Sequence, residues 1–86
     1  MSAESDQITG DVEVRIQAVI SDVFGLDPEE IGAATSKETI PTWDSLQHLI
    51  VILALEEEFD IHFSDDETAS LVTFPVIVAR VMNHLG

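Results

Sequence analysis

The first part of the chain repeats apolar residues at the spacing of one helix face, and this pattern constrains the fold most. Val12, Ile16, Ile20 and Val23 follow one another at steps of three and four residues, which is the repeat of an α-helix. The chain shows no internal repeat and no strand pattern longer than a few residues. Its 86 residues are enough for one domain. We therefore expect a single all-α domain.

The predicted boundaries come from helix-ending and helix-starting residues. Residues 1–8 are polar and are expected to form a flexible tail, so that residues 9–86 make up the domain. Gly25 is expected to end the first helix in a left-handed conformation. A second helix is predicted from about Ser45 to Phe59, and a short third one from Asp65 to Leu71. A fourth follows, capped by Thr73 or Phe74 and with Pro75 in its first turn; its expected buried stripe is Phe74, Val78, Val81 and Leu85.

A long connection separates the first two predicted helices. Leu26 to Thr42 contains two prolines and a glycine and no helical period. It exceeds the usual loop length, so we expect it to be functional or held against the core. Ile31 and Ile40 are the expected anchors, and Pro28–Glu30 is expected to form one helical turn. The predicted fold is a four-helix bundle with a long first loop and a short third helix.

The composition excludes several classes of function. Seventeen acidic residues against three Lys and Arg give a net charge of −14, so no basic patch for nucleic acid can form. Such a charge attracts basic protein surfaces, although it can also serve solubility alone. Without cysteine, neither disulfides nor thiolate zinc sites are possible, and no metal site is expected. The start of the chain does not resemble a signal peptide, and Leu49–Leu55 is too short to span a bilayer. We expect a cytoplasmic protein with no membrane association.

One serine stands at the start of the second predicted helix. A helix N-terminus offers unpaired N–H groups and a partial positive charge, which favour a phosphate group. If Asp44 caps the helix, with Gln47 as the reciprocal partner, the Ser45 hydroxyl is free to be modified. The alternative is that Ser45 itself is the cap.

The chain resembles the acyl carrier proteins in an ordered set of motifs. Asp44-Ser45-Leu46 matches their signature at the start of the second helix, and the sequence LALEEEFDI follows at Leu53–Ile61. Upstream, GLDPEEI at Gly25–Ile31 is similar to the exit of the first helix in that family. Downstream, residues 65–86 match its third and fourth helices. The resemblance covers roughly residues 10–86.

The resemblance implies a carrier function. A phosphopantetheinyl transferase would attach 4'-phosphopantetheine from coenzyme A to Ser45, flanked by Asp44 and Leu46. The arm would carry acyl or aminoacyl groups as thioesters. The expected partners are that transferase and acyl or aminoacyl ligases, synthases or transferases with basic docking surfaces. The chain is expected to act as a monomer, and an unmodified acidic adaptor for basic proteins is the alternative function.

The second helix is apolar around most of its circumference, which leaves two interpretations. Either it is a central helix packed on most sides, or it has a core face and a docking face. In the second interpretation Val51, Leu55 and Phe59 face the core, whereas Leu46, Ile50 and Leu53 emerge beside Ser45. The predicted partner-binding residues are Trp43, Gln47, Ile50, Leu53, Glu56 and Glu57.

Three residues depart from the pattern of fatty-acid-synthesis carriers. Gln47 and Ile50 stand where that family typically has acids, and Trp43 replaces a small residue. These differences favour a specialised lipid, polyketide or peptide pathway over housekeeping fatty acid biosynthesis. The alternative role for Trp43 is a hydrophobic staple over the helix start.

An enzymatic function does not fit these residues. A triad of Ser45, His48 and Asp44 fails because Asp44 directly precedes the serine and cannot orient the histidine as a base. No catalytic residues are therefore predicted.

Overall fold

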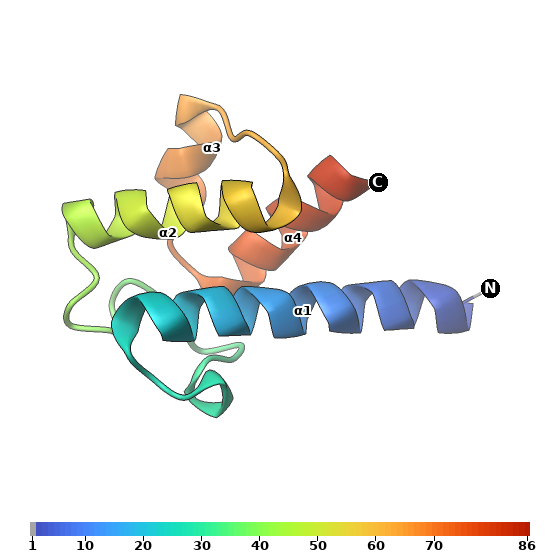
Figure 1. The fold of residues 1–86 in the computed structure, drawn as a ribbon, viewed down its shortest axis with the longest axis horizontal. Helices are drawn as coiled ribbons and strands as arrows, with labels where there is room; N and C mark the ends of the chain where they lie inside the picture. Colours follow the sequence, from blue (N-terminus) through green and yellow to red (C-terminus); the bar gives the residue numbers. More distant parts are fainter. Residues whose placement is uncertain (1) are drawn as a thin grey trace.

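The structure, a computed structural model, describes the backbone of residues 2–86 and the side chains of residues 10–86. The described chain forms four α-helices and one 3-10 turn: α1 (Ser2–Phe24), η1 (Pro28–Glu30), α2 (Ser45–Phe59), α3 (Asp65–Ser70) and α4 (Phe74–Leu85). α1 and α2 lie side by side and run in opposite directions; α4 packs against α1, and α3 lies on the side of α2 away from α1 (Figure 1). The predicted all-α bundle with a long first loop and a short third helix is confirmed.

The first helix begins earlier than the apolar repeat indicates. Its backbone is helical from Ser2. Met1 lies outside the described residues, as do the side chains of residues 2–9, so the flexibility of residues 1–8 and the domain boundary stay predictions. The end of the helix is as expected: Gly25 has φ 67°, and the Leu26 N–H donates to the Ser21 carbonyl at 2.8 Å. A residue without Cβ adopts this left-handed conformation at little cost.

One apolar core joins α1, α2, α4 and the loops. Ile16, Ile20, Leu55 and Ile77 are among its fully buried side chains. On α4 the predicted stripe is partly wrong: Phe74 and Val81 are buried as expected, but Ile77 takes the inward position, Val78 is half-buried and Leu85 is exposed.

The difference on α4 has a simple geometric cause. With 3.6 residues per turn, Phe74, Ile77 and Val81 share a face as well as the predicted set does, so the periodicity alone did not choose between them. Leu85 lies in the last turn, next to the end of the chain.

The long first loop is held at both of its predicted anchors. Ile31 and Ile40 are buried in the core, and the Gln17 side chain donates to the Ile31 carbonyl at 2.6 Å. Further along, the Lys37 N–H donates to the Val72 carbonyl at 2.8 Å and the Phe74 N–H to the Thr35 carbonyl at 2.9 Å. The loop is therefore tied to the segment between α3 and α4.

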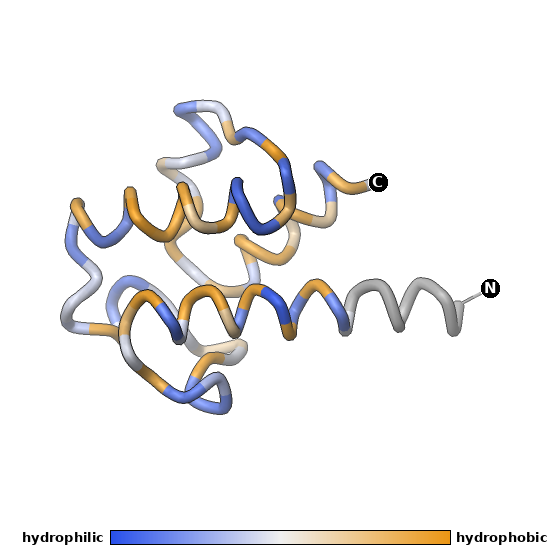
Figure 2. The backbone as a smooth tube through the Cα atoms, in the orientation of Figure 1, coloured by the Kyte–Doolittle hydropathy of each residue, from blue (hydrophilic) through white to orange (hydrophobic). Residues whose placement is uncertain are grey.

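A single arginine joins α1 to the C-terminal end of α2. Arg15 Nε lies 2.8 Å from a Glu58 carboxylate oxygen, its Nη2 donates to the Glu58 carbonyl at 2.8 Å, and its guanidinium lies 4.4 Å from the centre of the Phe59 ring. The tube in Figure 2 is hydrophobic through most of α2 and becomes hydrophilic at this end. None of the described helices combines the length and the apolar character needed to cross a bilayer.

Candidate functional site

The start of α2 presents Ser45 to solvent. Asp44 has extended backbone angles, and its carboxylate accepts a hydrogen bond from the Gln47 N–H at 2.9 Å. Asp44 is therefore the N-cap, as predicted, and the alternative in which Ser45 caps the helix is wrong. The Asp44 N–H bonds the Thr42 carbonyl at 3.0 Å, so the reciprocal bond expected from the Gln47 side chain does not form. Ser45 is the first helical residue and is exposed.

The Ser45 hydroxyl has no structural role in the described part of the chain. No hydrogen bond between residues 10 and 86 involves this oxygen. Leu46, the next residue, is also exposed. The predicted trio Asp44-Ser45-Leu46 thus consists of one capping carboxylate followed by two residues that are open to solvent.

Trp43 lies inside the molecule, which contradicts its assignment as a surface contact for partners. Its exposed fraction is 3%, and its ring packs 5.3 Å from that of Phe24 on α1. The indole N–H donates to His48 Nδ1 at 3.1 Å. Trp43 precedes the N-cap and contacts the fourth helical residue, which is the geometry of a staple over a helix start. Burying this large apolar ring stabilises the fold more than leaving it exposed to solvent would.

His48 is hydrogen-bonded through both ring nitrogens. Nδ1 accepts from Trp43, and Nε2 lies 2.8 Å from the Thr68 carbonyl of α3. An indole N–H can only donate, so Nδ1 must be unprotonated and Nε2 must carry the proton. Neither nitrogen contacts Ser45. The imidazole is therefore not available as a base for the serine hydroxyl.

The outer face of α2 is an unbroken apolar strip, which we call the apolar face. Its four residues are Leu46, Leu49, Ile50 and Leu53, with exposed fractions of 64, 52, 39 and 56%. The opposite face carries the buried residues Val51, Ile52, Leu55 and Phe59. α2 therefore has one buried and one exposed apolar face, so the central-helix alternative is wrong, and docking at the exposed face stays a prediction. Sequence reasoning left out Leu49 and Ile52, although the i, i+3, i+4, i+7 spacing of the apolar face includes Leu49.

The sequence of this chain is similar to that of a known protein. No protein-family model matches the chain. Over 72 residues the chain is 30% identical to an acyl carrier protein of Thermosynechococcus vestitus, a match that covers 84% of this chain and 89% of the relative. The chain belongs to the acyl carrier protein family. Members of this family are carriers rather than enzymes, so the prediction that the chain is not an enzyme is confirmed.

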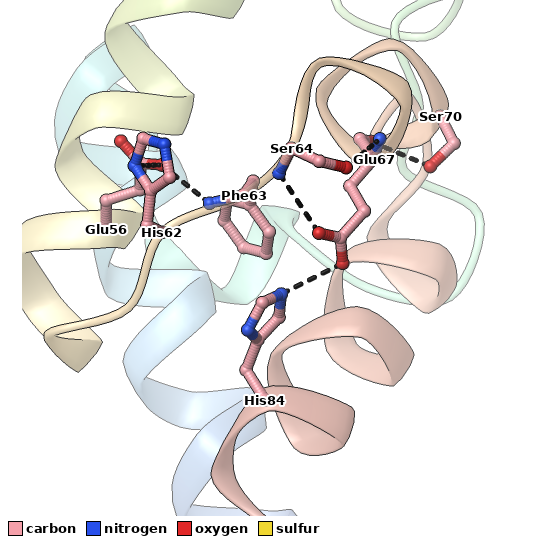
Figure 3. A network of polar contacts seen from close by, with 7 residues as sticks. All are labelled: Glu56, His62, Phe63, Ser64, Glu67, Ser70 and His84. Atoms are coloured by element: carbon pink, nitrogen blue, oxygen red, sulfur yellow. Dashed lines mark hydrogen bonds and ion pairs between the residues drawn. The ribbon is translucent and has the colours of Figure 1, made fainter.

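In this acyl carrier protein, the three glutamates that end α2 have different environments. Glu56 is turned inward: it accepts from the Phe63 N–H at 2.7 Å and lies 3.1 Å from His62 Nδ1. Figure 3 shows this contact beside the loop that leads to α3. Glu58 pairs with Arg15. Glu57 is exposed and has no ion pair within the described residues. Glu56 is thus engaged in holding the α2–α3 link, which weakens its assignment as a partner contact.

The carrier's third helix is capped at one end and joined to α4. Ser64 and Glu67 form a reciprocal capping box, with bonds of 3.0 and 3.2 Å. The other Glu67 oxygen lies 2.9 Å from His84 Nε2 (Figure 3). The Ser64 N–H, followed by His84, lowers the pKa of Glu67 from its ordinary value of 4.5, because hydrogen bonds and a nearby cation favour the charged carboxylate.

Proposed function

We propose that this protein carries acyl or aminoacyl groups as thioesters on a 4'-phosphopantetheine arm attached to Ser45. One observation carries the proposal: in a chain of the acyl carrier protein family, Ser45 lies exposed at the first position of α2 with its hydroxyl unengaged. The thiol at the end of the arm would supply the thioester. The chain itself has no cysteine that could compete for cargo.

The surroundings of Ser45 fit a phosphodiester. The His48 N–H begins the helical ladder at the Asp44 carbonyl, 2.8 Å away, and the Gln47 N–H is bonded to the Asp44 carboxylate. The N–H groups of Ser45 and Leu46 therefore remain at the positive end of a helix of 15 residues. The Asp44 charge opposes a phosphate, but this carboxylate is already engaged in capping.

Coenzyme A would supply the phosphopantetheine group that is attached to Ser45. The Ser45 oxygen would bond to the phosphorus next to pantetheine while the pyrophosphate bond of coenzyme A breaks. The serine proton leaves with the adenosine bisphosphate product. This reaction needs a transferase, because no base within the described residues is hydrogen-bonded to the Ser45 hydroxyl.

The apolar face of α2 is the proposed docking surface for that transferase and for acyl or aminoacyl ligases, synthases and transferases. From Ser45 to Leu55 the helix has no Asp, Glu, Lys or Arg, so desolvating this face costs little. Glu57, with the overall charge of −14, would meet basic side chains at the rim of the contact. Gln47 is half-buried and would contribute at most one edge of the surface.

The apolar face also supports a specialised lipid, polyketide or peptide pathway. Gln47 and Ile50 leave Asp44 as the one charged residue at the start of α2, so we propose that partners recognise this surface chiefly by apolar contact rather than by charge. Binding of a cognate synthase would then depend only weakly on salt. Binding that falls steeply with salt would contradict this recognition. The monomeric state and the cytoplasmic location stay predictions.

Intact-mass analysis tests the central proposal. The purified chain is incubated with coenzyme A, Mg²⁺ and a broad-specificity phosphopantetheinyl transferase. We expect the mass of one phosphopantetheine to be added to the wild type and to Thr42→Ala, a control that removes a neighbouring exposed hydroxyl. We expect no addition to Ser45→Ala. A folded wild type that gains no mass would support the alternative, an unmodified acidic adaptor for basic proteins.

A further inference from the structure

We propose that His48 is a positioning residue for the modification of Ser45, and that it acts only with a neutral imidazole ring. The inference rests on the proposed function of Ser45. Its basis is a continuous chain of hydrogen bonds from the Trp43 indole through His48 to the Thr68 carbonyl. We call these three residues the His48 latch.

The latch joins the end of the long loop, the start of α2 and the more distant α3. Trp43 belongs to the end of the long loop, two residues before Ser45; His48 lies one turn into α2; and Thr68 is on α3, twenty positions away from His48. The centre of the buried Trp43 ring lies 5.3 Å from that of Phe24 and 6.1 Å from that of His48. Fixing Trp43 restricts the backbone that enters Asp44 and Ser45. A transferase that must reach the Ser45 oxygen benefits from this restriction, because an ordered acceptor loses less entropy on binding.

The chemistry of the latch allows only one protonation state. The Trp43 N–H needs an unprotonated Nδ1, whereas the Thr68 carbonyl needs a proton on Nε2. A protonated ring has two donors, so it can keep Thr68 but must lose Trp43. Protonation of the ring should therefore release Trp43, and with it the loop, while the contact with α3 remains.

The charged groups on the surrounding elements do not replace this contact. The acid closest to His48 in sequence is Asp44, the N-cap of its helix, whose carboxylate is bonded to the Gln47 N–H. On α3 the acid that precedes Thr68 in the chain is Glu67, which is bonded to Ser64 and His84. Phe24, which meets the latch from α1, does not titrate.

Two substitutions separate the halves of the latch. In His48→Asn the side-chain oxygen can take the place of Nδ1 and accept from Trp43, but nothing reaches Thr68. In His48→Gln the side-chain nitrogen can take the place of Nε2 and donate to Thr68, but the Trp43 bond is lost. His62→Gln is the matched control, because His62 is 89% exposed and lies outside the latch.

The first measurement follows the indole N–H of Trp43 by NMR. The chain has a single tryptophan, so one indole signal reports the latch. We expect this signal to titrate with acid in the wild type and in His62→Gln. It should be insensitive to pH in His48→Asn and should show the released position at every pH in His48→Gln. An indole signal that ignores both pH and the His48 substitutions overturns the latch, whatever Ser45 does.

The second measurement is the initial rate of phosphopantetheine transfer to Ser45. At about pH 8, where histidines are neutral, we expect His48→Gln to be about fivefold slower than the wild type, the equivalent of one lost neutral hydrogen bond. His48→Asn should stay within about twofold. The ratio of wild type to His48→Asn cancels the pH dependence of the transferase, and this ratio should fall about fivefold on acidification.

The outcomes distinguish the latch from the proposed function. Equal rates for the wild type and His48→Gln, with a ratio to His48→Asn that does not change with pH, would overturn the positioning role while leaving Ser45 modification intact. Failure of the folded wild type to be modified at any pH would overturn the proposed function itself. Circular dichroism of each variant at each pH shows that the compared proteins are folded.

Discussion

The two faces of α2 are built from the same residue types but lie in opposite environments. Leu55 has no exposed surface, whereas Leu53, two positions earlier, is more than half exposed. The inner face belongs to the core, whereas the residues of the apolar face are exposed. The residue type thus does not predict whether a leucine in a helix is buried. Its position around the helix axis determines its burial. Exposed apolar residues in a continuous strip indicate a surface that a partner covers.

The largest expected effect tests this contrast directly. Leu55→Ala should lower the free energy of unfolding by about 3 kcal/mol, because it leaves a cavity in the core. Leu53→Ala, the same change on the apolar face, should cost less than about 0.5 kcal/mol. Urea denaturation measures both values. Similar losses of unfolding free energy in the two variants would show that the apolar face is also packed and would contradict the difference between the two faces.

A smaller effect is expected at the N-terminal end of α2. Asp44→Ala removes the cap and should destabilise the protein by about 1 kcal/mol. Ser45→Ala should change stability by less than about 0.5 kcal/mol, since the hydroxyl is unbonded within the described residues. Thermal and urea unfolding of both variants provide the check. If Ser45→Ala proves the more damaging of the two, Asp44 is not the effective cap.

A pH series separates the packed core from the polar contacts around α3. The pKa of Glu67 is lowered in the folded state, so its contribution to stability is present above its ordinary value of 4.5 and is lost as the pH falls below it. Glu67→Gln should therefore be less stable than the wild type at neutral pH, and the difference should close in acid. The cost of Leu55→Ala should change little with pH. If Glu67→Gln remained less stable than the wild type in strong acid, its effect would come from packing rather than from the carboxylate charge.

The smallest effect on stability is expected from polar substitution of the apolar face. Leu49→Gln should change the free energy of unfolding by less than about 0.5 kcal/mol. It should nevertheless weaken binding of the transferase, because an exposed apolar anchor is lost. Titration calorimetry with the transferase gives the affinity, and Val14→Gln, at an exposed apolar position on α1, is the matched control. Equal affinities for the wild type and Leu49→Gln would move the docking surface elsewhere.

Features that depend on neighbouring residues could be predicted well. The spacing of apolar residues located α1, Gly25 ended it, and Asp44 capped α2, since these depend on bonds and angles within a few residues. The exposure of Ser45 follows from the same local geometry. The relative from Thermosynechococcus vestitus places the chain in the family that the ordered motifs indicated.

Features that depend on distant residues escaped prediction. Trp43 is a plausible surface anchor by sequence, yet the end of α1 buries it. The acids of α2 look equivalent, but Glu56 folds back on the Phe63 N–H and Glu58 is taken by Arg15, 43 positions away. The helical period also left open whether Ile77 or Val78 would face the core.

For this protein the sequence alone determined that the chain is helical, where α1 ends, and that a serine stands at the start of the second helix. The tertiary structure decided which apolar residues are buried, which acids stay available and which contacts His48 makes. The reason is the range of the forces: capping and helical hydrogen bonds close within a turn. Burial and side-chain pairing depend on which segments of a compact chain meet, and the His48 latch exists only because α3 packs beside the start of α2.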